Sequence, residues 1–255
     1  MSDKNNDKEV SAQSYSSSQE INAYNRLLEL SKNCPIPGKD LHANLGLFLT
    51  RASFSRMIFM HELYKSILNT HGVIMEFGTR WGQNLALFTT LRNIYEPYNT
   101  SRKIIGFDTF EGFPSVSEKD GDSETVEIGR LAVTLNYEEY LHEVLMNQEQ
   151  LGPRSEIKKH KIVKGNVMDT LPEYLSKHPE TIISLAYLDL TLYEPTKKCL
   201  ELIRPHLAKN SIVAFDELTL EEYPGETIAL IEEWGLSDYE IIRNPISPHQ
   251  SYLRF

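Results

Sequence analysis

Acidic side chains and tight-turn residues recur where the apolar runs of this sequence end. The runs cover residues 73–77, 103–107, 160–165, 181–190 and 211–217. The residues at or beside their ends are Glu76 and Gly78, Asp108, Gly165 and Asn166, Asp189, and Asp216 and Glu217. Carboxylates in such places can accept hydrogen bonds from a ribose diol or hold an ammonium group. Merely solvated strand ends would scatter such residues, so we expect a binding site.

The elements that position these residues follow from the spacing of the runs. Helical patterns separate the apolar runs, and this alternation indicates an α/β fold with a mostly parallel sheet. The tail from residue 238 reads as two strand-like pieces joined by a proline-containing turn, which predicts a final antiparallel pair. In sheets of this kind the ligand lies at the carboxyl ends of the strands. The pattern therefore predicts that the acids listed above share one edge.

The chain divides into three predicted parts. Residues 1–18 are rich in Ser, Asn, Asp and Lys, and we expect them to be disordered. Residues 19–70 show two helical patterns and are expected to form an N-terminal cap or an oligomer contact. Residues 71–255 form the α/β domain, in which the long aperiodic stretch 111–135 is expected to act as a lid loop.

Composition excludes several classes of function. The 255 residues carry a net charge of -10, which disfavours nucleic acid and anionic membranes as partners. Two cysteines, Cys34 and Cys199, offer no disulfide framework, and the polar N-terminus "MSDKNNDKEV" has no signal-peptide pattern. We therefore expect a cytoplasmic protein.

The first strand-to-helix turn, "EFGTRWGQN", indicates the kind of ligand. Gly78 and Gly82 allow a tight turn and a close approach to the backbone, although an ordinary turn would also use them. The central glycine of a dinucleotide fingerprint is missing, which favours a nucleoside without phosphates. Glu76 can hold an amino group and Asp108 a ribose, although Asp108 alone could equally be a turn cap.

Four motifs together resemble a known family. They are "VIMEFGTRWGQN", "GFDTFEGFP", "YLDLTLYEPT", and "SIVAFDE" followed by "YPGE", and they resemble the macrocin O-methyltransferase family. The match runs from about Ser53 to the end of the chain. It implies a class I, Rossmann-like methyltransferase fold of seven strands with an antiparallel last strand. It also implies S-adenosylmethionine as cofactor, with S-adenosylhomocysteine as product, a sugar-like small-molecule acceptor and a homo-oligomer.

The resemblance also implies roles for individual residues. The expected cofactor-binding residues are Glu76, Gly78, Thr79, Gly82, Asp108, Thr109, Phe110 and Asn166, the last standing where many relatives carry Asp. The expected ligands of a divalent metal, usually Mg²⁺, are Asp189, Asp216 and Glu217. Hard carboxylate oxygens suit that ion, which would chelate the acceptor and stabilise its alkoxide. Without a metal, Asp189 would be a helix cap and the other two would begin a polar loop.

Thr191 is the main departure from the family. The second acid of the family's Asp-x-Asp motif would be the general base, and a threonine hydroxyl lacks the basicity to replace it. Asp189 and His249 are the expected catalytic residues, with His142 as another candidate base. The resemblance implies an O-methyltransferase acting on a hydroxyl of a sugar or sugar-bearing metabolite. The alternatives are a cofactor-binding protein without turnover and, third, a nicotinamide-dependent reductase.

Overall fold

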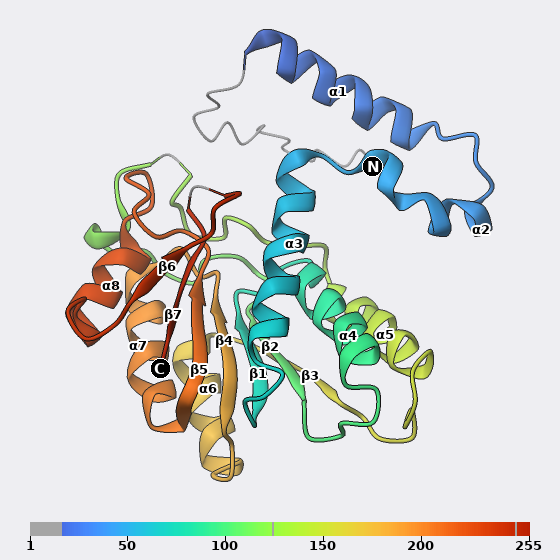
Figure 1. Cartoon of the computed structure of the whole chain (residues 1–255). Helices are drawn as coiled ribbons and strands as arrows, with labels where there is room; N and C mark the ends of the chain where they lie inside the picture. The colour runs from blue at the N-terminus through green and yellow to red at the C-terminus, as the bar shows by residue number, and fades with distance from the viewer. Residues whose placement is uncertain (1–16, 124, 248) are drawn as a thin grey trace. The chain divides into compact units, whose positions relative to one another are not determined.

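The computed structural model describes residues 17–123, 125–247 and 249–255 (Figure 1). The chain separates into two compact units, one ending at Phe54 and one running from Ser55 to Phe255. Residues 1–16 of the segment expected to be disordered lie outside the described residues. The proposed division into a cap over 19–70 and a domain over 71–255 stays a prediction.

The first unit consists of short helices. They are α1 (Ser18–Lys32), α2 (Gly38–Leu41), η1 (His42–Phe48) and the beginning of α3 (Arg51–Ser66). A reciprocal capping box starts α1, in which the Ser17 hydroxyl accepts from the Glu20 N–H and Glu20 accepts from the Ser17 N–H at 2.7 Å. This box satisfies main-chain donors that the first turn of a helix otherwise leaves without partners.

The second unit is built around a seven-stranded sheet in the order β3-β2-β1-β4-β5-β7-β6 (Figure 1). The strands are β1 (Val73–Phe77), β2 (Ile104–Asp108), β3 (His160–Lys164), β4 (Ile183–Leu188), β5 (Leu207–Phe215), β6 (Ile241–Arg243) and β7 (Ser251–Arg254). Strands β1 to β5 pair in parallel, and β7 runs antiparallel to both β5 and β6. The predicted α/β architecture and its closing antiparallel pair are confirmed.

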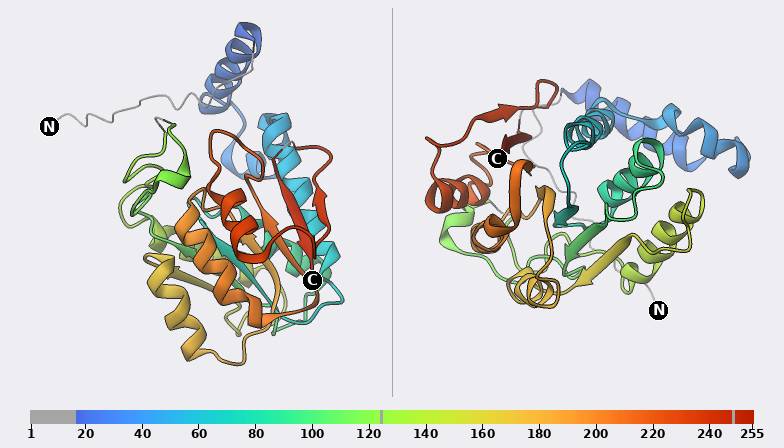
Figure 2. Two further views of the ribbon diagram at one scale, coloured as in Figure 1. Left: turned by 90° about the vertical axis from the view of Figure 1, so that its left-hand side faces the viewer. Right: turned by 60° about the horizontal axis from the view of Figure 1, so that its bottom comes forward.

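Helices cover both faces of this sheet (Figure 2). The α3 face is packed by α3, α4 (Gln83–Tyr95) and α5 (Tyr137–Gln150). The α7 face is packed by α6 (Val167–Lys177), α7 (Tyr193–Ile203) and α8 (Gly225–Trp234), and η3 (Arg204–His206) leads from α7 into β5. None of the helices in the described parts of the chain combines the length and apolarity needed to cross a membrane.

The loop expected to act as a lid is tied to the domain at Asp120. This residue ends the short helix η2 (Glu118–Asp120), and its side chain is 1% exposed. Its carboxylate accepts from the Ser117 N–H at 2.6 Å and from the Tyr193 N–H at 2.5 Å. Because Leu192 provides no side-chain cap for α7, Asp120 supplies that helix with a capping acceptor from a distant loop.

We expect Asp120→Ala to lower the free energy of unfolding by about 2–4 kcal/mol, because two buried main-chain donors lose a charged acceptor. Urea unfolding followed by circular dichroism measures this change. The matched control is Asp122→Ala, which removes an exposed carboxylate from the same loop and should leave the stability close to that of the wild type. Equal stability of the two variants would contradict the anchoring role of Asp120.

Candidate active site

The alternation of side chains along the strands decides which acids meet. Ile212 and Ala214 of β5 belong to the core of the α3 face, whereas Val213 and Phe215 belong to that of the α7 face. Successive strand residues point to opposite faces, so Asp216 continues toward the α3 face and Glu217 toward the α7 face. The same alternation in β4 directs Asp189 to the α3 face, after Leu185 and Tyr187.

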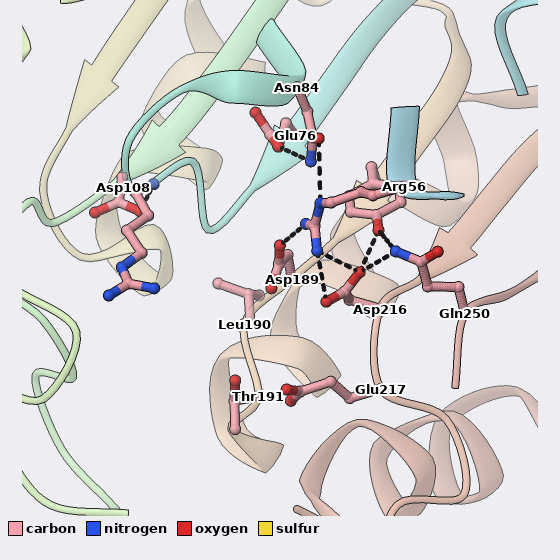
Figure 3. Close-up of polar contacts among 12 residues, drawn as sticks. Arg56, Glu76, Asn84, Asp108, Asp189, Leu190, Thr191, Asp216, Glu217 and Gln250 are labelled. Atoms are coloured by element: carbon pink, nitrogen blue, oxygen red, sulfur yellow. Dashed lines mark hydrogen bonds and ion pairs between the residues drawn. The ribbon is translucent and has the colours of Figure 1, made fainter. Parts of the chain in front are cut away.

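Arg56 of α3 bridges the two aspartates on the α3 face (Figure 3). Its Nη2 forms an ion pair with Asp189, and its Nη1 lies 3.0 Å from the Asp216 carboxylate. Asp216 also accepts from the Tyr187 hydroxyl at 2.5 Å and from Gln250 Nε2 at 2.8 Å. The sheet and α3 together therefore hold both carboxylates in fixed directions.

Burial makes Asp189 a carboxylate that titrates near neutral pH. Its removal from water is the main cause that raises its pKa to about 7, and the charge of Asp216 adds to this effect. The guanidinium of Arg56 acts in the opposite direction. A carboxylate with this pKa is suited to accept a proton in the physiological range.

Glu217 lies beside Thr191 on the α7 face (Figure 3). Burial, followed by the charges of Asp189 and Asp216, raises the pKa of Glu217 to about 8. Its Oε2 is buried and has no hydrogen-bond partner among the described residues. Neighbouring Glu226 is also buried, and it accepts from the N–H groups of Leu190 at 2.9 Å, Thr191 at 3.1 Å and Glu217 at 3.2 Å. Glu226 thereby joins the turns that follow β4 and β5.

Thr191 has a left-handed backbone with φ of 65°. This region is unfavourable for a β-branched residue, and such conformations persist where the surroundings fix them. Arg80 after β1, Phe110 after β2 and Thr219 after β5 also have positive φ, at 47°, 59° and 64°. Four of the eight non-glycine residues with positive φ in the described ranges therefore lie after the carboxyl ends of strands, near the acids.

The glycine turn after β1 lies directly against the end of β4. Gly78 has φ of 90°, and a Cβ placed there would come within 1.8 Å of the Asp189 carbonyl oxygen. Gly82, with φ of 74°, caps α4. Glycine is required at Gly78 because a side chain has neither a favourable backbone conformation nor space.

Glu76 carries an unsatisfied acceptor next to this turn. Its Oε1 accepts from Asn84 Nδ2 at 2.7 Å, while Oε2 is buried without a partner among the described residues. Burial raises the pKa of Glu76 to about 8. A buried carboxylate in this condition fits a ligand that brings a cation, such as the ammonium group of an amino acid.

The remaining predicted cofactor residues form the turns around this place. Asp108 accepts from the N–H groups of Arg80 at 2.7 Å and Phe110 at 2.5 Å, so its carboxylate organises the turns after β1 and β2. The Thr109 hydroxyl donates to the Gly112 carbonyl at 2.7 Å. Asn166 caps α6 by accepting from the Met168 N–H at 3.0 Å. Thr79, which is 5% exposed, lies in the Gly78–Gly82 turn.

The three carboxylates predicted to bind Mg²⁺ are not brought together in this arrangement. Their oxygen chemistry suits the ion, but Asp189 and Asp216 are directed at Arg56, while Glu217 lies on the other side of the sheet edge. Over the described ranges of the chain, no group of three or more His, Cys, Asp or Glu residues is placed to hold a metal ion. The residues as arranged do not fit bound Mg²⁺, which stays a prediction from the sequence.

His249 contributes its main chain to this edge of the sheet, since its carbonyl accepts from the Leu218 N–H at 3.1 Å. The side chain of the next residue, Gln250, is the one that reaches Asp216. His142 lies elsewhere, where its Nδ1 is 2.9 Å from His160 Nε2. Of the two histidines considered as bases, His142 therefore belongs to a different cluster.

Sequence reasoning missed five residues of this site: Arg56, Asn84, Tyr187, Gln250 and Glu226. Asn84 and Tyr187 stand inside motifs already singled out, and the alternation of β4 places Tyr187 on the same face as Asp189. Glu226 lies in the "YPGE" motif. The sequence offers no comparable signal for Arg56, which stands in a helix far from the strand ends.

Of three comparisons with known proteins, the one with solved structures found relatives of this chain. No protein-family model matches the chain, and no curated protein is significantly similar to it. Among solved structures, the calicheamicin methyltransferase CalS11 is 45% identical, with a TM-score of 0.92 and 95% of each chain covered. An apo structure of CalS11, described as a TDP-rhamnose 3'-O-methyltransferase, is 42% identical, with a TM-score of 0.84 and coverage of 95% of this chain and 96% of the other.

The O-methyltransferase NovP shares the fold at 18% identity, with a TM-score of 0.58 and coverage of 78% of this chain and 79% of its own. These likenesses confirm the class I methyltransferase fold. The four motifs also predicted a likeness to the calicheamicin sugar methyltransferase, which the alignments over nearly the full length of both chains bear out. The protein therefore belongs to the same O-methyltransferase family as the calicheamicin methyltransferase.

Proposed function

We propose that the protein transfers the methyl group of S-adenosylmethionine to a hydroxyl of a sugar or sugar-bearing secondary metabolite. One observation carries this proposal: Asp189, whose pKa is raised to about 7 by burial, lies against the glycine turn expected to bind the methyl donor. The CalS11 relative, described as a TDP-rhamnose 3'-O-methyltransferase, suggests a nucleotide-linked deoxysugar as the first acceptor to test.

In this proposal the cofactor is held by the turns after β1, β2 and β3. Glu76 would pair with its ammonium group, Asp108 would accept from its ribose, and Asn166 would lie near its adenine. Gly78, Thr79, Gly82, Thr109 and Phe110 would line the same turns. The orphaned buried Oε2 of Glu76 supports this assignment, because a bound ammonium would supply the missing partner. When bound, the cofactor supplies an electrophilic methyl group.

Asp189 is the proposed general base. When the acceptor hydroxyl is methylated, the Asp189 carboxylate would take up the hydroxyl proton. Two observations favour Asp189 over His249: its raised pKa and its position beside Gly78. Thr191 then needs no basicity of its own. Assistance by Mg²⁺ stays a prediction, and no step of this mechanism is assigned to the ion. A homo-oligomer and a cytoplasmic location likewise stay predictions.

We expect Asp189→Asn to lower kcat by about 100- to 10,000-fold, because the amide cannot accept the proton. The assay measures methylated product by mass spectrometry, with TDP-rhamnose as acceptor. S-adenosylhomocysteine affinity, measured by calorimetry, should stay close to that of the wild type. Asp169→Asn removes an exposed carboxylate from α6 and should leave kcat unchanged. Full activity of Asp189→Asn would overturn the assignment of the base.

Cofactor binding should release protons at neutral pH. The pKa of Glu76 in the free protein is raised to about 8, so the carboxyl is protonated at pH 7 and must ionise to pair with an ammonium group. Affinity for S-adenosylhomocysteine should therefore rise with pH toward about 8 and fall at higher pH, where the ligand's own ammonium group loses its proton. Calorimetry at pH 7 in buffers of different ionisation enthalpy should report the release of about one proton.

Glu76→Gln tests the source of that proton. The variant should bind S-adenosylhomocysteine at least about tenfold more weakly, since a charge-assisted hydrogen bond is lost. Its binding should also lose most of the proton release. Glu143→Gln, an exposed change on α5, is the matched control and should behave as the wild type. Undiminished proton release in Glu76→Gln would assign the proton to another group.

A further inference from the structure

We propose that Arg56 is the resident counter-ion of Asp189 and Asp216 and that it keeps divalent cations off this pair. In this view the guanidinium and a metal ion are alternative occupants of one position. The proposal rests on the proposed function in one respect: the metal ion is excluded beside Asp189, the proposed general base.

The guanidinium uses all three of its nitrogen atoms in this place (Figure 3). Nη2 and Nη1 are bound to Asp189 and Asp216, and Nε lies 3.4 Å from Asn84 Oδ1. Its Cζ also lies 5.8 Å from the centre of the Tyr187 ring. A guanidinium has fixed planar donors, so four contacts to α4, to β4 and to the ends of β4 and β5 leave it one orientation.

The backbone of α3 delivers Arg56 to this position. Phe59, Met60 and Leu63 lie three, four and seven residues later on the same side of the helix, and each is at most 1% exposed. Because these side chains pack into the core of the α3 face, the helix is fixed against the sheet. Arg56 therefore starts from a rigid element, and its side chain is 28% exposed.

The Asp216 carboxylate has little capacity left for a metal ion. Asp216 accepts from Tyr187, Gln250 and Arg56, which occupies three of about four lone-pair directions. Glu217, the third predicted ligand, is turned to the α7 face by the alternation of β5. A divalent ion beside Arg56 would also meet a like charge at short range in a partly buried site. Ion binding therefore requires Arg56 to leave.

The experiment measures Mn²⁺ binding to the purified protein by electron paramagnetic resonance, without cofactor or acceptor. Arg56→Met should bind Mn²⁺ at least about tenfold more tightly than the wild type, a size usual for coupling between two ligands. Lysine in Arg56→Lys cannot bridge both carboxylates, so the Mn²⁺ affinity of this variant should lie between those of the wild type and Arg56→Met. The Arg56→Lys variant still tests the proposal if Arg56→Met folds poorly. Added Mn²⁺ should raise the melting temperature of Arg56→Met more than that of the wild type.

Two controls locate the effect. Arg154→Met removes an exposed arginine that pairs with Glu156, so it changes net charge equally and should leave Mn²⁺ affinity unchanged. Asp189→Asn added to Arg56→Met should abolish the gain in affinity. The proposal is overturned if neither Arg56 variant binds Mn²⁺ more tightly than the wild type, or if the gain survives Asp189→Asn. Absence of methylation would refute the proposed function alone, because ion binding is measured without turnover.

Discussion

The ion pairs of Arg56 with Asp189 and Asp216 are the interaction on which the arrangement of acids at this edge of the sheet depends. Four acids, Asp189, Asp216, Glu217 and Glu226, are buried wholly or in part at one edge of the sheet, and the guanidinium of Arg56 pairs with the first two. Removing carboxylates from water is costly unless they are paired or hydrogen-bonded. Burial, with the charges of the neighbouring acids adding to it, explains why the pKa values of Asp189 and Glu217 are raised to about 7 and 8.

Hydrogen bonds and ion pairs around Arg56 also link Glu76 to the two aspartates. Glu76 is bound by Asn84, Asn84 is approached by Arg56, and Arg56 holds Asp189 and Asp216. A cation bound at Glu76 would therefore be linked, through the side chains of Asn84 and Arg56, to the Asp189 carboxylate that we propose as the base. Tyr187 of β4 and Gln250, which directly precedes β7, complete the network by donating to Asp216. In such networks the contribution of one member depends on the presence of the others.

The sequence was sufficient for the architecture because hydrophobic patterning determines it. Short apolar runs and helical patterns predicted the parallel strands, and the tail predicted β6 and β7. The positions of Asp189 and Asp216 at strand ends followed in the same way. Glu217 was expected to converge with these two aspartates. The side chains of "SIVAFDE" alternate between the two faces of the sheet, however, so Ile212, Ala214 and Asp216 share one face and Glu217 lies on the other. Arg56 could not be predicted, since contact between residues 133 positions apart depends on how α3 packs.

The contact between Gly78 and Asp189 limits how this protein can diversify. Main chain alone fills the space between the glycine turn after β1 and the end of β4, since a Cβ at Gly78 would lie 1.8 Å from the Asp189 carbonyl oxygen. No exchange of side chains can lengthen or shorten that spacing without moving β1 or β4, which pair in continuous register from Ile74 and Leu185 to Phe77 and Leu188. The spacing between Gly78 and Asp189 is therefore set by the pairing of β1 with β4. Variation that leaves this spacing intact is left to the loops and side chains around it.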